Sequence, residues 1–150
     1  MWDFVYGWLG MNSVGIRARF LIKKEMFFFP VGMLLRAMGA MPVDRGNRNN
    51  MVDYVAGLFK EREELAFIIT PEGTRKLNHR WKKGFYYIAQ KAEVPILVAF
   101  LDYARKEGGV GMVMYPSGDY EADFKILEAF YRDKTAKHPE KFNLSQQNSN

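Results

Sequence analysis

The sequence predicts an α/β fold: a mostly parallel sheet flanked by helices on both faces. Short apolar segments typical of strands alternate along the chain with segments whose apolar residues recur at three- and four-residue spacing, which is typical of helices. Residues 65–69 and 94–101 are continuous apolar runs, the pattern of strands buried on both faces of a sheet. Strands that alternate with helices favour parallel pairing.

Composition limits the class of protein without fixing its partner. The 150 residues suit one domain, and 48% hydrophobic residues exclude wholesale disorder. A net charge of +5 suits phosphorylated metabolites, acidic lipid or nucleic acid. The absence of cysteine excludes disulfides, thiolate metal sites and a cysteine nucleophile. The long uncharged stretches, 4–16 and 26–35, are too short for a spanning helix, which needs about 20 apolar residues.

The first half of the chain reads as alternating helices and strands. We expect a helix over 2–11, a strand over 16–22, a helix that starts at Pro30 and stops at Gly39, and a strand end at 41–43. Asn49 or Asn50 is expected to cap the next helix. Its buried face would consist of Met51, Val52, Val55, Leu58 and Phe59.

The second half continues with a strand over 65–69 and a loop over 70–78. A helix over 83–92 and a strand over 94–101 follow, then a turn at Gly108-Gly109 into a strand over 110–115. Asp119 is expected to cap a helix that ends near residue 132. We therefore predict one domain over 1–132 and a polar, partly disordered tail over 133–150.

Two polar loops follow strands of the predicted sheet, and each places arginine beside glycine. Arg45-Gly46 follows 41–43, and residues 70–76 follow 65–69. Ligands of parallel sheets bind beyond the carboxyl ends of the strands. Glycine allows close approach to the backbone, and the planar guanidinium matches phosphate oxygens. The loops could therefore clamp one phosphate; the spacing is equally compatible with plain turns and solvated arginines.

The loop Pro71-Glu72-Gly73-Thr74-Arg75 resembles the third motif of the glycerophospholipid acyltransferases, the family that includes the lysophosphatidate (1-acylglycerol-3-phosphate) acyltransferases. Residues 39–45, which end in Arg45, resemble the second motif. Residues 94–96, a proline in an apolar strand, resemble the fourth. The resemblance runs from residue 2 to about residue 115.

The resemblance implies transfer of an acyl group from a coenzyme A or carrier-protein thioester to a hydroxyl of a glycerol phosphate or lysophospholipid. The thioester is a co-substrate, and no cofactor is implied. Arg45 would pair with the acceptor phosphate. Glu72 and Gly73 would shape the acceptor pocket, and Thr74 and Arg75 would add phosphate contacts.

The family's first motif is a histidine, four residues and an aspartate, in which the aspartate orients the histidine as general base. Trp2-Asp3-Phe4 matches the segment around that aspartate, so the histidine would precede Met1. We therefore expect Met1 to be an internal methionine of a longer protein, and the first strand of the fold to be missing. His79 and His138 have no orienting carboxylate at a recognisable spacing.

The missing histidine makes us expect little or no acyltransferase activity from this chain, because loss of a general base costs about 10²- to 10⁴-fold in rate. The alternative is a non-catalytic phospholipid- or acyl-CoA-binding module that keeps the phosphate clamp. The resemblance also implies a cytoplasmic protein that works peripherally at the inner face of a membrane. Nucleic acid is disfavoured because acidic residues are interspersed among the basic ones.

Three further features have structural as well as functional interpretations. Residues 80–83 are expected to be a solvated helix start rather than a contact for coenzyme phosphates or lipid headgroups. Phe27-Phe28-Phe29 is expected to pack in the core rather than to line an acyl groove or enter a membrane. The two histidines lack metal-ligand spacing, so no metal site is predicted.

Overall fold

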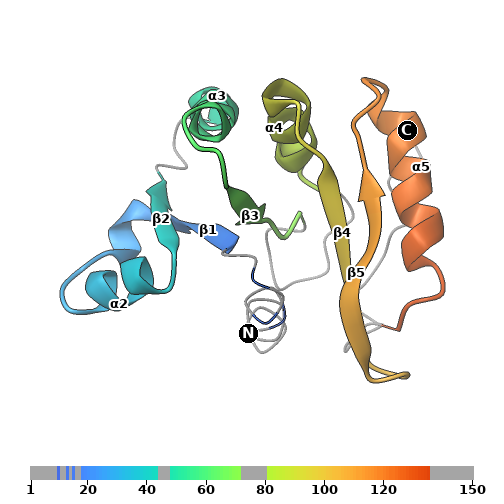
Figure 1. The fold of residues 1–150 in the computed structure, drawn as a ribbon, viewed down its shortest axis with the longest axis horizontal. Coiled ribbons are helices and arrows are strands. Elements are labelled where there is room, and N and C mark those ends of the chain that lie inside the picture. Colours follow the sequence, from blue (N-terminus) through green and yellow to red (C-terminus); the bar gives the residue numbers. More distant parts are fainter. Residues whose placement is uncertain are drawn as a thin grey trace. The chain divides into compact units, whose positions relative to one another are not determined.

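The computed structural model describes Gly10, Ser13, Gly15 and residues 18–43, 48–71 and 81–135 (Figure 1). The chain divides into two compact units, the N-terminal unit Met1–Ile69 and the C-terminal unit Thr70–Asn150. The elements of the N-terminal unit are β1 (Ala18–Lys23), the 3-10 helix η1 (Lys24–Met26), α2 (Val31–Ala37), β2 (Ala40–Val43), α3 (Arg48–Lys60) and β3 (Ala66–Ile68). Those of the C-terminal unit are α4 (Gly84–Ala92), β4 (Ile96–Asp102), β5 (Glu107–Met114) and α5 (Tyr120–Tyr131).

The N-terminal unit is built on a parallel sheet with strand order β2-β1-β3, which confirms the predicted α/β class. Along β1, buried Ala18 and Phe20 flank exposed Arg19, so one face of the strand is covered. β3 is half-buried at each of its residues. The prediction that 65–69 is buried on both faces was therefore wrong, because a short apolar run does not reveal how many of its faces are covered.

The helices of the N-terminal unit start and stop close to their predicted positions. Pro30 is the N-cap of α2, and Gly39 ends the turn after that helix with a φ of +94°, a conformation that favours glycine. α3 already begins at Arg48, so Asn49 and Asn50 lie inside its first turn and do not cap it. The helix propensity of asparagine is only moderately low, so a first turn tolerates it.

The predicted buried face of α3 is confirmed, with one addition. Val55 and Leu58 are buried, and the other predicted positions are half-buried. Ala56, at 2% exposure, also belongs to that face. Its small side chain lets the helix approach its neighbours closely, but alanine is a weak signal of burial in a sequence.

The C-terminal unit contains an antiparallel pair of strands, β4 and β5 (Figure 1). In β4, Val98 and Asp102 are buried whereas Leu97 and Ala99 are exposed. The prediction that 94–101 is a strand buried on both faces was therefore wrong. The core of the unit covers one face of the hairpin. The apolar side chains that alternate with the buried ones along β4 lie on the other, exposed face.

The β4–β5 turn lies at residues 103–106, where Lys106 takes a φ of 56°, and not at Gly108-Gly109 as predicted. Both glycines lie inside β5, opposite Leu101 and Phe100. A Cβ on Gly108 would stand 2.6 Å from Cδ2 of Leu101. Gly108 thus lies under the side chain of Leu101 on the opposite strand, and the carboxylate of Asp102 accepts the hydrogen bonds that form the turn.

The core of the C-terminal unit combines aromatic side chains from both helices with aliphatic side chains and a methionine. Its buried members are Tyr86, Val98, Met114, Tyr120, Phe124 and Leu127. The carboxylate of Asp119 accepts hydrogen bonds from the N–H groups of Glu121 and Ala122, both at 3.1 Å, which confirms the predicted cap of α5. Among the residues that the structure describes, no helix is long and apolar enough to cross a bilayer.

Candidate functional site

The carboxyl ends of the three parallel strands lie at one edge of the N-terminal sheet. Val43, which ends β2, is level with Lys23, which ends β1. On the other side of β1, Ile68 at the end of β3 is level with Phe20. The two outer strands are thus about 10 Å apart, twice the usual spacing between neighbours. The chain segments that follow β2 and β3 leave the sheet at its carboxyl edge, which is where parallel sheets bind ligands.

In the C-terminal unit, one hydrogen bond ties together the two ends of the segment that carries the Glu-Gly-Thr-Arg motif. The N–H of Lys82 donates to the carbonyl oxygen of Pro71 at 2.9 Å. Trp81 is half-buried, and its ring makes edge contacts with Phe124 at 5.6 Å and Tyr131 at 5.8 Å between centroids. Pro71 and Lys82, which border this segment, are thus held next to each other, and Trp81 beside Lys82 packs against the aromatic core.

A buried carboxylate, Asp123, holds the turn before α5. Its Oδ2 accepts hydrogen bonds from the hydroxyl of Tyr86 and the N–H of Ser117, both at 2.7 Å. Burial by itself would raise the pKa of Asp123, but these hydrogen bonds outweigh it and lower the pKa below its usual value. Burial and the contact with Asp123 raise the pKa of Tyr86, whose oxygen also accepts from the N–H of Gly118 at 3.0 Å. The carboxylate of Asp123 is therefore ionised and has a structural role. The hydrogen bonds that it accepts make it a poor general base.

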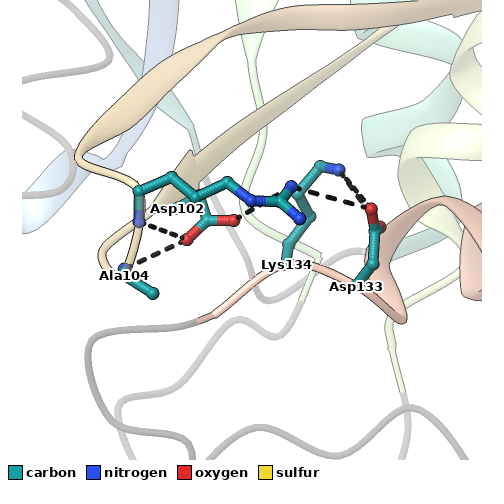
Figure 2. A network of polar contacts seen from close by, with 5 residues as sticks. Asp102, Ala104, Asp133 and Lys134 are labelled. Carbon is teal, nitrogen blue, oxygen red and sulfur yellow. Dashed lines mark hydrogen bonds and ion pairs between the residues drawn. The ribbon is translucent and has the colours of Figure 1, made fainter.

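A second buried carboxylate, Asp102, organises the β4–β5 turn (Figure 2). Its Oδ1 accepts from the N–H groups of Ala104 at 3.0 Å and Arg105 at 3.1 Å, an Asx turn. The guanidinium of Arg105 lies 3.8 Å from Asp102 and 3.8 Å from Asp133. Lys134 hydrogen-bonds to Asp133 at 3.1 Å and thereby lowers the pKa of that carboxyl. These contacts fasten the hairpin turn to the end of α5, which is a structural task.

Comparison with known proteins identifies the family to which this framework belongs. The family model named Acyltransferase matches residues 1–101. The chain belongs to the Acyltransferase family. It is also 35% identical over 83 residues to human 1-acyl-sn-glycerol-3-phosphate acyltransferase beta, an alignment that covers 51% of this chain and 30% of the human protein. No solved structure matches the chain significantly.

The match to the Acyltransferase family spans the whole parallel sheet and ends at Leu101, next to the last residue of β4. It therefore includes both strand-end motifs and the segment around Asp3. β5 and α5 lie beyond the matched residues.

The site residues predicted from the sequence lie outside the described residues. They are Asp3, Arg45, Glu72, Gly73, Thr74 and Arg75. His79 and His138, the two histidines weighed as substitutes for the missing base, also fall there. What the structure describes is the framework on the approach to each motif: Val43 for the second motif, and Ile68 and Pro71 for the third. The clamp itself therefore stays a prediction.

Sequence reasoning missed the role of Trp81. The segment 80–83 was expected to be a solvated helix start, and this expectation holds for exposed Lys82 but is wrong for Trp81, which packs against the aromatic core. The signal was present in the spacing, since Trp81 stands four residues before Phe85 and the two rings meet at 6.3 Å. The neighbouring charges obscured it.

Proposed function

We propose that this domain transfers an acyl group from an acyl thioester, carried by coenzyme A or a carrier protein, to a hydroxyl of a glycerol-3-phosphate or lysophospholipid acceptor. The observation that carries the proposal is the Acyltransferase match over residues 1–101. The matched residues include the parallel sheet, whose strands β2 and β3 lead toward the second and third motifs. The similarity to a human enzyme that is named for 1-acyl-sn-glycerol-3-phosphate supports an acceptor that bears a phosphate.

Each predicted site residue has a role in this proposal. The guanidinium of Arg45 pairs with the acceptor phosphate, and Thr74 and Arg75 add contacts to it. Glu72 and Gly73 shape the pocket for the glycerol part of the acceptor. Asp3 orients a histidine that takes the proton from the acceptor hydroxyl as the hydroxyl oxygen attacks the thioester carbonyl. The thiolate leaves with the electrons of the broken C–S bond.

The phosphate contact is tested by equilibrium binding of lysophosphatidate below its micelle concentration. Arg45→Ala should weaken binding about 10-fold or more, because hydrogen bonds to charged groups each contribute about 1.5–3 kcal/mol. Arg132→Ala is the matched control, since it removes an exposed arginine from the C-cap of α5. Equal losses in the two variants would reject a specific clamp and would leave only general attraction between the basic chain and an anion.

A non-catalytic binding module is the second candidate, and one sequence observation favours it. The chain has two histidines, and neither stands five residues before an aspartate. We therefore expect the 150-residue polypeptide to bind acceptor and acyl-CoA and to turn them over at least about 100-fold more slowly than a version extended at its N-terminus with the His–x4 half of the motif. Thioester cleavage at ordinary enzyme rates by the 150-residue chain would show that the missing histidine is not the base. No gain on extension would favour the binding module.

The place of action in this proposal is the cytoplasmic face of a membrane, where the protein is attached peripherally. The support for this assignment is the amphiphilic character of the proposed acceptor, which concentrates at membranes. Cell fractionation tests the assignment: the protein should sediment with membranes and be released by carbonate or high salt. Full recovery in the soluble fraction at low salt would contradict it.

A further inference from the structure

The segment that joins β1 to α2 exposes large apolar side chains. Phe28 is 57% exposed and Phe29 is 83% exposed, whereas Phe27 is half-buried. The expectation that this triplet packs in the core is therefore wrong for two of its three members. Three more apolar side chains nearby in the chain, one in η1 and two in α2, are at least half exposed. We call the whole set the apolar patch: Met26, Phe28, Phe29, Met33 and Leu34.

The backbone beneath the apolar patch is held by its own hydrogen bonds. The N–H of Gly32 donates to the carbonyl of Phe28 at 2.7 Å, and the N–H of Met33 donates to Pro30 at 3.1 Å. A Cβ on Gly32 would lie 2.8 Å from the carbonyl oxygen of Phe27, so only glycine allows this close approach. The patch is therefore a formed surface, with its polar backbone groups turned to one another and its side chains turned outward.

Positively charged side chains flank the apolar patch along the chain. Lys23 and Lys24 precede it, and Arg36 follows with its guanidinium 5.8 Å from the ring centroid of Phe27. Glu25 is the single carboxylate within 23–38, so the cations are in excess. All four charged side chains belong to exposed residues. Apolar and aromatic side chains rimmed by lysine and arginine are the combination that binds the surface of an anionic bilayer.

We propose that the apolar patch docks this domain onto a bilayer surface that contains anionic lipids. Phe28 and Phe29 enter the boundary between headgroups and acyl chains, and Lys23, Lys24 and Arg36 lie near the lipid phosphates. α2 has seven residues and is about 10 Å long, against a hydrocarbon core of about 30 Å, so the segment lies on the bilayer and does not cross it (Figure 1). Water is removed from side chains that the fold leaves exposed, which drives the docking.

Charge complementarity selects the bilayer over the other possible occupants. A second copy of the chain would bring two cationic rims together, which like-charge repulsion opposes. An acyl chain of a substrate offers apolar surface but no extended array of phosphates to match three cations. Docking can be measured on vesicles without any acyl transfer, so this proposal does not depend on the phosphate clamp. Acceptor binding, in turn, is measured on monomeric lipid, so either proposal can fail alone.

The first test is flotation of the 150-residue chain with vesicles of phosphatidylcholine, with and without phosphatidylglycerol. Replacing both phenylalanines (F28A/F29A) should lower the partition coefficient about 10-fold or more on anionic vesicles. K23Q/K24Q should lower it about fivefold for each lysine on anionic vesicles and leave binding to neutral vesicles unchanged. Tyr115→Ala is the matched control: it removes a 69% exposed aromatic side chain outside the patch and should change nothing.

The second test locates the contact. The chain has no cysteine, so Phe29→Cys and Tyr115→Cys each give a single attachment point for an environment-sensitive fluorophore. On anionic vesicles, emission from position 29 should shift to the blue and be quenched by spin-labelled lipids, and emission from position 115 should not. Equal shifts at both positions, or no binding of the unmodified chain to anionic vesicles, would overturn the proposal. Loss of a dimer in F28A/F29A without any change in flotation would instead assign the patch to a second copy.

Discussion

The two units of the chain bury different kinds of side chain. In the described part of the N-terminal unit, the buried residues are mostly small and aliphatic, and Phe20 is the only aromatic one. In the C-terminal unit, aromatic rings dominate the core, and two carboxylates, Asp102 and Asp123, are buried with hydrogen bonds to the backbone. The difference indicates that the two units have different roles. The N-terminal unit provides strands that lead to the motifs, and the C-terminal unit has the core whose side chains contribute more to stability.

Truncation of one core residue in each unit tests this division most strongly. Tyr86→Ala should lower the free energy of unfolding by about 3–5 kcal/mol, because it leaves a large cavity and removes a partner from Asp123. Leu58→Ala in α3 should cost about 2 kcal/mol, the lower end of the range for such changes. Urea denaturation followed by circular dichroism measures both. A larger loss for Leu58→Ala than for Tyr86→Ala would reverse the assignment of the more tightly held core.

Two glycines of β5 sharpen the comparison within the C-terminal unit. A Cβ on Gly111 would lie 2.6 Å from Cζ of Phe130, whereas nothing stands within 4 Å of a Cβ on Gly109. Gly111→Ala should therefore destabilise the protein by about 1–3 kcal/mol through overpacking of the aromatic core. Gly109→Ala should change stability by less than about 0.5 kcal/mol. Thermal unfolding of the two variants side by side gives the answer, and equal melting temperatures would mean that Phe130 moves aside at little cost.

The buried carboxylate of Asp123 should make stability depend on pH at the acid end. The pKa of Asp123 is lower in the folded chain than its usual value of 3.8, so its contribution is complete above that value. This contribution is lost as the pH falls from about 5 through the folded pKa, because the unfolded chain binds the proton more readily. In urea denaturation from pH 7 down to pH 3, Asp123→Asn should show a shallower acid decline than the unmodified chain. Parallel declines would assign the acid sensitivity to other carboxyls.

The sequence predicted those parts of the fold that depend on local signals. Pro30, Gly39 and Asp119 mark helix ends correctly because a cap or a positive φ is decided by a few neighbouring residues. The glycines of β5 misled the prediction of the hairpin turn, since Gly108 lies within the strand under a side chain of the opposite strand. Sequence alone does not show which glycine serves a turn and which serves packing.

Exposure was the hardest property to predict, and it matters most for function. Phe28 and Phe29 have the composition of a core segment, and only the fold shows that both side chains are more than half exposed. Conversely, Trp81 stands among charged residues and is nevertheless held in the aromatic core. The chemistry of the candidate site came from motif resemblance, and the parallel sheet could be predicted because alternating strands and helices leave few other topologies.

The bond between Lys82 and Pro71 has a consequence for how this domain can diversify. A segment whose two ends are held together tolerates changes in its length, because the entropy of closing a loop rises by only about 0.6 kcal/mol for each doubling of its length. Insertions and deletions between Pro71 and Lys82 should therefore leave the flanking scaffold intact. Under the proposed function, such changes in length are a simple route by which one framework accommodates acceptors of different size.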